Sequence, residues 1–350
     1  MHAVFAKNLK HYRLMRNLSM SELAERTHLS ANAIKKYEHG QMMPSSTTLQ
    51  SLSKALGVKS MQLLQTWSSD VRIQPGPYRG RETRTQRSVE AVASSIEFEL
   101  GKYCTVLSLL PARRLPVPKG LLRIQVADVE QIERAAVDIR KHLSIPAIGP
   151  MPDMVMILEN LGYLVIDVPN APSWFDAQYG HVNDRPYIAL AADRPPDRQR
   201  HTLAHEIGHA CLTTVDVDDE DAAGRFGGAL LLPKEDMHRE LGHRRPHGIA
   251  MEELRFLQRE YRVSMKSIIK RARQLDILSQ PAEVALYKRL GGLGLTRDEE
   301  ADIPKEIPSV YRQLVVQLTI DEEISITRGA ELLRVDLPTM NRMLYGPALA

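Results

Sequence analysis

The stretch His205-Glu206-Ile207-Gly208-His209 decides how the rest of the chain is interpreted. Residues four apart lie on one face of a helix, so the two histidines can bind one metal ion. The glutamate beside them then faces a metal-bound water. Zinc hydrolases use this arrangement, in which two imidazoles and a third protein ligand leave one coordination position for water. The pattern predicts a hydrolytic zinc site, with two ordinary core histidines as the alternative.

The flanking sequence supports a buried motif helix. Residues 185–191 are a short apolar run typical of a strand, and a polar turn at 193–197 leads into the motif. Leu203, Ala204 and Ile207 give the motif helix an apolar face, so we expect it to be buried. Buried histidines need polar partners, and a metal ion supplies them.

A third metal ligand is expected from the acidic cluster that follows. The candidates are Asp218, Asp219, Glu220 and Asp221. Spacing alone does not choose among them, and a solvated cluster that starts a helix is the alternative interpretation. Small and apolar residues then recur at helical spacing as far as Pro233, which predicts a helix packed tightly against the motif helix.

These two segments resemble the ImmA/IrrE metallo-endopeptidases. The resemblance rests on residues 202–209 and on Phe226 to Pro233, and it extends over about residues 125–290. The second segment of that family reads approximately Glu-x-x-x-Asn-x-Phe-Ala-x-x-Leu-Leu-Met-Pro, and its glutamate is the third zinc ligand. Alignment on Phe226 and Pro233 places that glutamate at Glu220. This chain has Gly224 at the family's asparagine and Gly227 at its alanine.

The resemblance implies an α+β zincin-like domain with a small sheet. It implies one Zn²⁺ per chain, with Mn²⁺ as an alternative, held by His205, His209 and Glu220. Glu206 is then the general base that takes a proton from water and passes it to the leaving amine.

The group that stabilises the oxyanion is left open by the sequence. Tyr179, His181 and His201 are candidates because they flank the motif. His243 and His247 lie in an arginine-rich stretch and are interpreted as loop residues rather than ligands.

The N-terminal 66 residues carry a second pattern. Amphipathic helices are expected at about 4–14, 21–27 and 31–39, with Ser19 or Ser21 capping the second and Ser30 the third. Apolar residues at positions 49, 52, 56, 58, 61 and 64 are expected to add further core helices. Two short helices joined by a brief turn, with Ala24 and Ile34 buried, match a helix-turn-helix.

Charge indicates a nucleic-acid partner for this region. Residues 1–66 hold nine Lys or Arg and three Glu, a net charge of +6, whereas the whole chain is at +3. The pattern resembles the XRE (lambda-repressor/Cro-like) helix-turn-helix family. That resemblance implies that five residues face an operator: Ser30, Ala31, Asn32, Lys35 and Lys36. Asn32 is the best candidate for reading a base edge, because its amide can pair bidentately with adenine. The alternative is a small helical bundle used for protein contacts.

The complete chain is expected to be multidomain and mainly α. The expected parts are an all-α helix-turn-helix domain (1–67), a basic linker (68–88), a helical connector or dimerisation element (89–124), the metallopeptidase domain (125–290) and a helical C-terminal region (291–350). The last region includes a helix pair that suits either a packing tail or a second, degenerate helix-turn-helix. A length of 350 residues fits two or three domains.

The remaining composition indicates a cytoplasmic protein. The two cysteines do not form a disulfide framework, and we expect neither a secretory signal nor a membrane partner. Three functions stay open. The chain is a DNA-binding regulator, expected to be a homodimer, whose zinc peptidase cuts a partner repressor or antitoxin in a stress, phage or mobile-element response. Alternatively, its peptidase-like domain senses a ligand or holds a partner without proteolysis. In the third, it is the antitoxin of a two-gene module.

Overall fold

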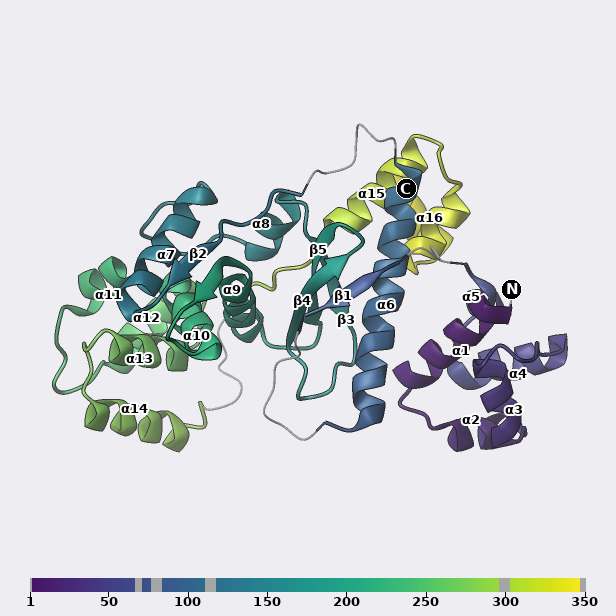
Figure 1. The fold of residues 1–350 in the computed structure, drawn as a ribbon, viewed down its shortest axis with the longest axis horizontal. Coiled ribbons are helices and arrows are strands. Elements are labelled where there is room, and N and C mark those ends of the chain that lie inside the picture. The colour runs from purple at the N-terminus through teal and green to yellow at the C-terminus, as the bar shows by residue number, and fades with distance from the viewer. Residues whose placement is uncertain (1, 67–70, 77–83, 111–117, 296–302, 347–350) are drawn as a thin grey trace.

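The structure is a computed structural model, and it describes residues 2–66, 71–76, 84–110, 118–295 and 303–346. Within these ranges there are seventeen helices and six strands, which confirms the predicted mainly helical, multidomain fold (Figure 1). In the described ranges, no helix combines the length and apolar character needed to cross a membrane.

Five short helices form the N-terminal domain. They are α1 (His2–Met15), α2 (Met20–Thr27), α3 (Ala31–Glu38), α4 (Ser46–Leu56) and α5 (Ser60–Leu64). Ser19 caps α2 through a capping box with Glu22, and Ser30 caps α3. Between α2 and α3 the chain turns at His28, whose φ of 56° is left-handed. The predicted core position of Met61 is wrong, because α5 buries Leu63 and leaves Met61 69% exposed.

A four-stranded sheet lies at the centre of the molecule, in the order β1-β4-β5-β3. The strands are β1 (Ile73–Pro75), β3 (Leu164–Val168), β4 (Ala177–Val182) and β5 (Arg185–Ala191). β3 runs parallel to β5, whereas β4 is antiparallel to both β5 and β1. A separate parallel pair joins β2 (Ile124–Val126) to β6 (Leu212–Thr214).

Helices cover both faces of this sheet (Figure 1). One face packs into the larger core, with α7 (Val129–His142), α8 (Met154–Asn160), α9 (Pro196–Cys211) and α10 (Asp219–Leu231). The other face packs against α6 (Gln86–Leu109) and α15 (Val310–Ile320). The larger core continues into α11 (Lys234–Leu241), α12 (Met251–Tyr261), α13 (Met265–Gln274) and α14 (Gln280–Gly292).

The stretch assigned to a basic linker contacts the folded domains at several of its described residues. Residues 73–75 pair with β4 as a strand of the sheet. Arg84 lies over the Trp174 ring at 5.0 Å, and Arg87 donates to the Asn17 carbonyl. The side chains of Arg84 and Arg87 therefore contact the folded domains. Residues 77–83 of this stretch, which include Pro77, Arg79 and Arg81, lie outside the described residues.

Helix α6 connects the N-terminal domain to the rest of the chain. His11 of α1 stacks on Phe98 of α6 with ring centroids 3.9 Å apart. On the same helix, Glu99 pairs with Arg334 at 3.1 Å, and the Arg334 guanidinium lies 5.0 Å from the Phe98 ring centroid. Three regions far apart in sequence therefore meet at one junction on α6.

The C-terminal helices repeat the local geometry of α2 and α3. Helices α16 (Ile326–Leu333) and α2 both have eight residues and a serine N-cap. Each is followed by a left-handed residue, and Arg334 (φ 55°) corresponds to His28. In each case the next helix is capped two residues later, and in the second unit Asp336 caps α17 (Leu337–Tyr345).

The two helix-turn-helix-shaped units differ in net charge. Residues 310–345 hold four Arg and five Asp or Glu, a net charge of −1, against +6 in the N-terminal domain. The second unit therefore has the shape of a helix-turn-helix without an excess of cations for phosphate.

Candidate functional site

Two histidines of α9 form the centre of the candidate site. Pro196 occupies the first turn of this sixteen-residue helix, where a proline costs no hydrogen bond. His205 and His209 lie one turn apart near its C-terminal end, with side chains 5% and 26% exposed. The apolar face predicted for the helix is buried in the larger core. Burial thus holds the two imidazoles at the boundary between core and solvent.

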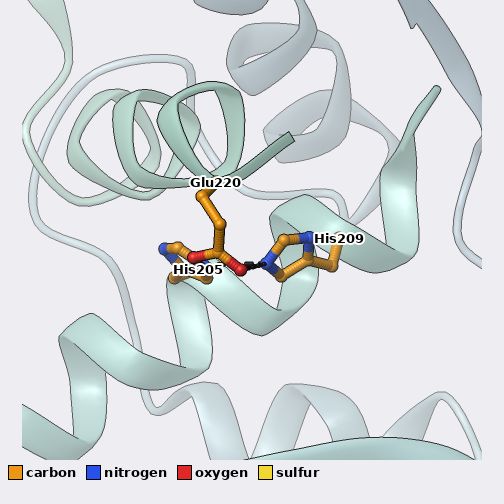
Figure 2. A group of neighbouring side chains, drawn as sticks. All are labelled: His205, His209 and Glu220. Carbon is orange, nitrogen blue, oxygen red and sulfur yellow. Dashed lines mark hydrogen bonds and ion pairs between the residues drawn. The ribbon is translucent and has the colours of Figure 1, made fainter. Parts of the chain in front are cut away.

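The acidic residues at the start of α10 have different roles. Asp218 is the N-cap and accepts hydrogen bonds from the backbone of Glu220 and Asp221, both at 3.0 Å. Asp219 accepts a hydrogen bond from the Thr214 hydroxyl. Glu220 joins the imidazoles across the helix crossing (Figure 2). Among the four carboxylates, Glu220 is the one that the described structure groups with both imidazoles.

The three side chains converge closely enough to share one ion. The Nε2 atoms of His205 and His209 are 2.9 Å apart, and the Glu220 carboxylate oxygens lie 3.5 and 3.3 Å from them (Figure 2). A tetrahedral zinc site with ligand bonds of about 2.0–2.2 Å places its donor atoms about 3.3 Å apart. The two-imidazole, one-carboxylate donor set and its spacing therefore fit zinc.

Small residues bring α9 and α10 together at this point. A Cβ at Gly227 would lie 3.2 Å from the His205 backbone nitrogen, and one at Gly208 would lie 3.0 Å from the Ala223 Cα. A Cβ at Gly224 would lie 3.9 Å from Nδ1 of the His205 ring. Gly224 and Gly227, the two positions at which this chain differs from the family pattern, therefore both lie against α9.

Glu206, the expected base, lies in α9 beside His205 and is 3% exposed. Of the oxyanion candidates, Tyr179 and His181 lie on β4, and their side chains interact at 3.3 Å. Burial raises the pKa of Tyr179, which Arg123 opposes and Cys211 reinforces. β4 contacts α9, and Tyr179 packs against the core to which α9 contributes.

The other histidines lie elsewhere. His201 is one turn before His205 and contacts a small cavity together with Gly224 and Lys270. His243 stacks near His238, with centroids 4.3 Å apart. In the part of the chain that the structure describes, neither His243 nor His247 belongs to a group of potential metal ligands.

A cavity of about 370 Å³ adjoins Glu220. Its wall includes Arg225 of α10 together with Lys270 and Gln274 of α13. Sequence reasoning missed Lys270 and Gln274, because α13 begins about fifty residues beyond the motif and no local pattern links the two segments.

A buried ion cluster fixes α10 beside its neighbours. Glu133 of α7 accepts two hydrogen bonds from Arg271 of α13, at 2.7 and 2.6 Å, and one from Arg225 at 2.9 Å. Burial raises the pKa of Glu133, but the hydrogen bonds and charges of the two arginines outweigh it and leave the pKa lowered. The helix that carries Glu220 is thus tied to α7 and α13.

The predicted operator-facing residues lie on the exposed side of α3. Ala31, Asn32, Lys35 and Lys36 are all exposed, and Ser30 uses its hydroxyl to cap the helix. Tyr37 is buried. Glu38 forms a buried ion pair with Arg13 at 2.5 Å, so its side chain is directed into the domain and away from the exposed face of α3.

Comparison with protein families covers both regions. A family model described as helix-turn-helix matches residues 9–63, and one described as IrrE N-terminal-like domain matches residues 159–273. The chain joins a helix-turn-helix domain to an IrrE-like domain. Searches of curated proteins and of solved structures returned no significant match. The IrrE-like match begins within α8 and ends within α13, so it includes the three clustered side chains.

Proposed function

We propose that this protein is a DNA-binding transcriptional regulator whose IrrE-like domain is a zinc endopeptidase. The convergence of His205, His209 and Glu220 from α9 and α10 carries the proposal. The match to the IrrE N-terminal-like family supports it, because that family comprises metallopeptidases. A cytoplasmic location suits a protein that acts on DNA.

The chain's own residues supply the positions that peptide hydrolysis needs. Zinc, held by His205, His209 and Glu220, would lower the pKa of a bound water toward 7 and polarise the scissile carbonyl. Glu206, buried beside His205, would take the proton and deliver it to the leaving amine. Tyrosine is protonated at neutral pH, and burial raises the pKa of Tyr179 further, so its hydroxyl can donate a hydrogen bond to the developing oxyanion.

We infer that the substrate is a protein partner, a repressor or an antitoxin, whose removal changes transcription. The DNA-binding role rests on the helix-turn-helix match and on the exposed cations of α3. Homodimers that read two half-sites are common among such proteins.

A second candidate is a regulator whose IrrE-like domain senses a ligand or holds a partner without cutting it, including an antitoxin role. The fusion favours it, because a peptidase acting on a separate protein does not need an operator-binding domain of its own. Glu206 favours the first candidate, because a structural zinc site has no use for a general base.

Glu206→Gln separates the two candidates. The zinc-loaded protein and this variant would each be incubated with the purified products of the flanking genes, and cleavage followed by mass spectrometry. We expect wild type to cut one product and the variant to be slower by about 100-fold or more, with zinc and DNA binding retained. Equal cleavage by the variant would contradict the assigned base. Full zinc occupancy without any cleavage would favour the sensor.

A further inference from the structure

The outer strand of the central sheet comes from outside the IrrE-like match. β1 has three residues and is the first element after α5 of the DNA-binding domain. It pairs antiparallel with β4 in the register Ile73 to Val182, Gln74 to His181 and Pro75 to Gly180 (Figure 1). Without β1, the hydrogen-bonding edge of β4 would be open.

The attachment of β1 depends mainly on the backbone. Gly76 donates to the Tyr179 carbonyl at 2.9 Å, and Asn183 donates to the Arg72 carbonyl at 2.9 Å. Gln74 and Pro75 are exposed, and Ile73 is only partly buried. A strand this short with so little burial is readily displaced, because local opening is cheapest where little apolar surface becomes exposed to water.

The edge of β4 lies beside the candidate metal centre. β4 contacts α9 directly, and Tyr179 packs into the core that α9 shares. His181 projects to the same face as Tyr179, and Gln74 opposite it does likewise, because facing residues of an antiparallel pair share a face. A chain segment paired with this edge therefore places alternate side chains, as at Gln74, on the side of the sheet that faces α9.

Gly180 allows a second backbone to approach closely. A Cβ there would lie 2.7 Å from the Gln74 carbonyl oxygen. A glycine inside a strand often marks such an approach, and main-chain pairing accepts many sequences.

We propose that the edge of β4 docks an extended peptide by antiparallel strand addition, and that β1 occupies this edge in the resting protein. The peptide is the substrate segment of the proposed peptidase, so the proposal rests on that function. Docking removes β1 from the sheet. Because β1 follows the DNA-binding domain in the chain, substrate docking and the attachment of that domain become coupled.

A disulfide between β1 and β4 tests the proposal in the full-length protein. Ile73 and Val182 form a pair flanked by hydrogen-bonded pairs, so their Cα atoms should be about 4.5 Å apart, within disulfide range. The variant Ile73→Cys with Val182→Cys would be compared oxidised and reduced. The probe is a fluorescein-labelled peptide with the sequence of residues 71–76, followed by fluorescence polarisation. Ile73→Cys alone and wild type, treated identically, control for Cys104 and Cys211.

We expect the reduced variant to bind the peptide at least tenfold more tightly than the oxidised variant. Equal binding in the two states, or no binding by the reduced protein, would overturn the docking surface. Hydrogen exchange on wild type is the second measurement. The Gly76 amide should exchange faster than the amides that join β4 to β5, and equal protection would also overturn the proposal. Peptide binding without cleavage of any partner would overturn the peptidase function and leave the docking surface standing.

Discussion

Gly227 of α10 lies directly against His205 of α9. A Cβ at this glycine would lie 3.2 Å from the His205 backbone nitrogen and 3.4 Å from its Cα. The neighbour is helix backbone, which cannot move aside as a flexible side chain can. The distance between the two imidazoles and Glu220 therefore depends on a residue that is not a ligand.

Gly227→Ala is expected to weaken zinc binding. The added methyl group separates α9 from α10, at a cost of about 1–3 kcal/mol for overpacking, and moves Glu220 away from the imidazoles. The matched control is Gly228→Ala, whose new Cβ would meet the side chains of Gln274 and Arg271 at 3.3 and 3.6 Å. Zinc affinity would be measured by chelator competition. Equal zinc affinities of the two variants would contradict the claim that the close contact of α9 and α10 at Gly227 positions Glu220.

Glu133→Gln is expected to destabilise the IrrE-like domain by about 3–5 kcal/mol at pH 7, because it leaves the buried charge of Arg271 uncompensated. The pKa of Glu133 is lowered in the folded state. Its contribution to the free energy of unfolding is therefore fully present above the unfolded-state pKa of about 4.3, and it is lost as pH falls through the folded-state pKa. The difference in free energy of unfolding between the variant and wild type should therefore become smaller at acidic pH.

The control for this change is Glu130→Gln, on the same helix. Its pair with Arg134 spans 3.9 Å, and the Glu130 side chain is 84% exposed, so we expect a change under about 1 kcal/mol. Urea unfolding checks both variants. Equal stabilities of the two variants at pH 7 would show that the ion cluster does not hold α10.

Acid should weaken the junction between α1 and α6. Burial, aided by the charge of Arg334 and opposed by Glu99, lowers the pKa of His11 from 6.5 to about 3. The folded state therefore resists protonation, so stability is complete above pH 6.5 and falls as pH drops toward 3. The loss reaches about 2 kcal/mol at pH 5. His11→Gln should remove this part of the pH dependence, measured by unfolding at pH 7 and pH 5. If the free energy of unfolding of the variant falls between pH 7 and pH 5 by as much as that of wild type, His11 is not the source of the pH dependence.

Lys35→Ala combined with Lys36→Ala should weaken operator binding and flatten its salt dependence. Removing one lysine that neutralises a phosphate reduces the slope of log K against log salt by about 1. Lys54→Ala, an exposed lysine of α4, is the control. Binding would be measured by fluorescence anisotropy at several salt concentrations. A slope equal to that of wild type would place these lysines away from phosphate.

Local signals made much of this structure predictable. Capping serines, the histidine spacing and the strand at 185–191 each depend on neighbours in sequence, and the structure has α2, α3, α9 and β5 at those places. The family resemblance selected Glu220, and the helix crossing brings it to the histidines.

Features that depend on distant partners were not predictable in the same way. β1 has three residues and no alternating pattern, and it becomes a strand through β4, about a hundred residues later in the chain. Arg84 contacts Trp174 over a similar separation in sequence. The exposure of Met61 likewise depends on how α5, which buries Leu63, packs in the folded domain.

The central claim is a zinc ion held by His205, His209 and Glu220. The direct test is the metal content of protein purified without chelator, for wild type, Glu220→Ala and the control Asp221→Ala, whose exposed side chain lies in the same turn. We expect about one zinc per chain in wild type and in the control, and loss or clear weakening in Glu220→Ala. No metal in wild type after zinc is supplied, or full occupancy in Glu220→Ala, would contradict the account.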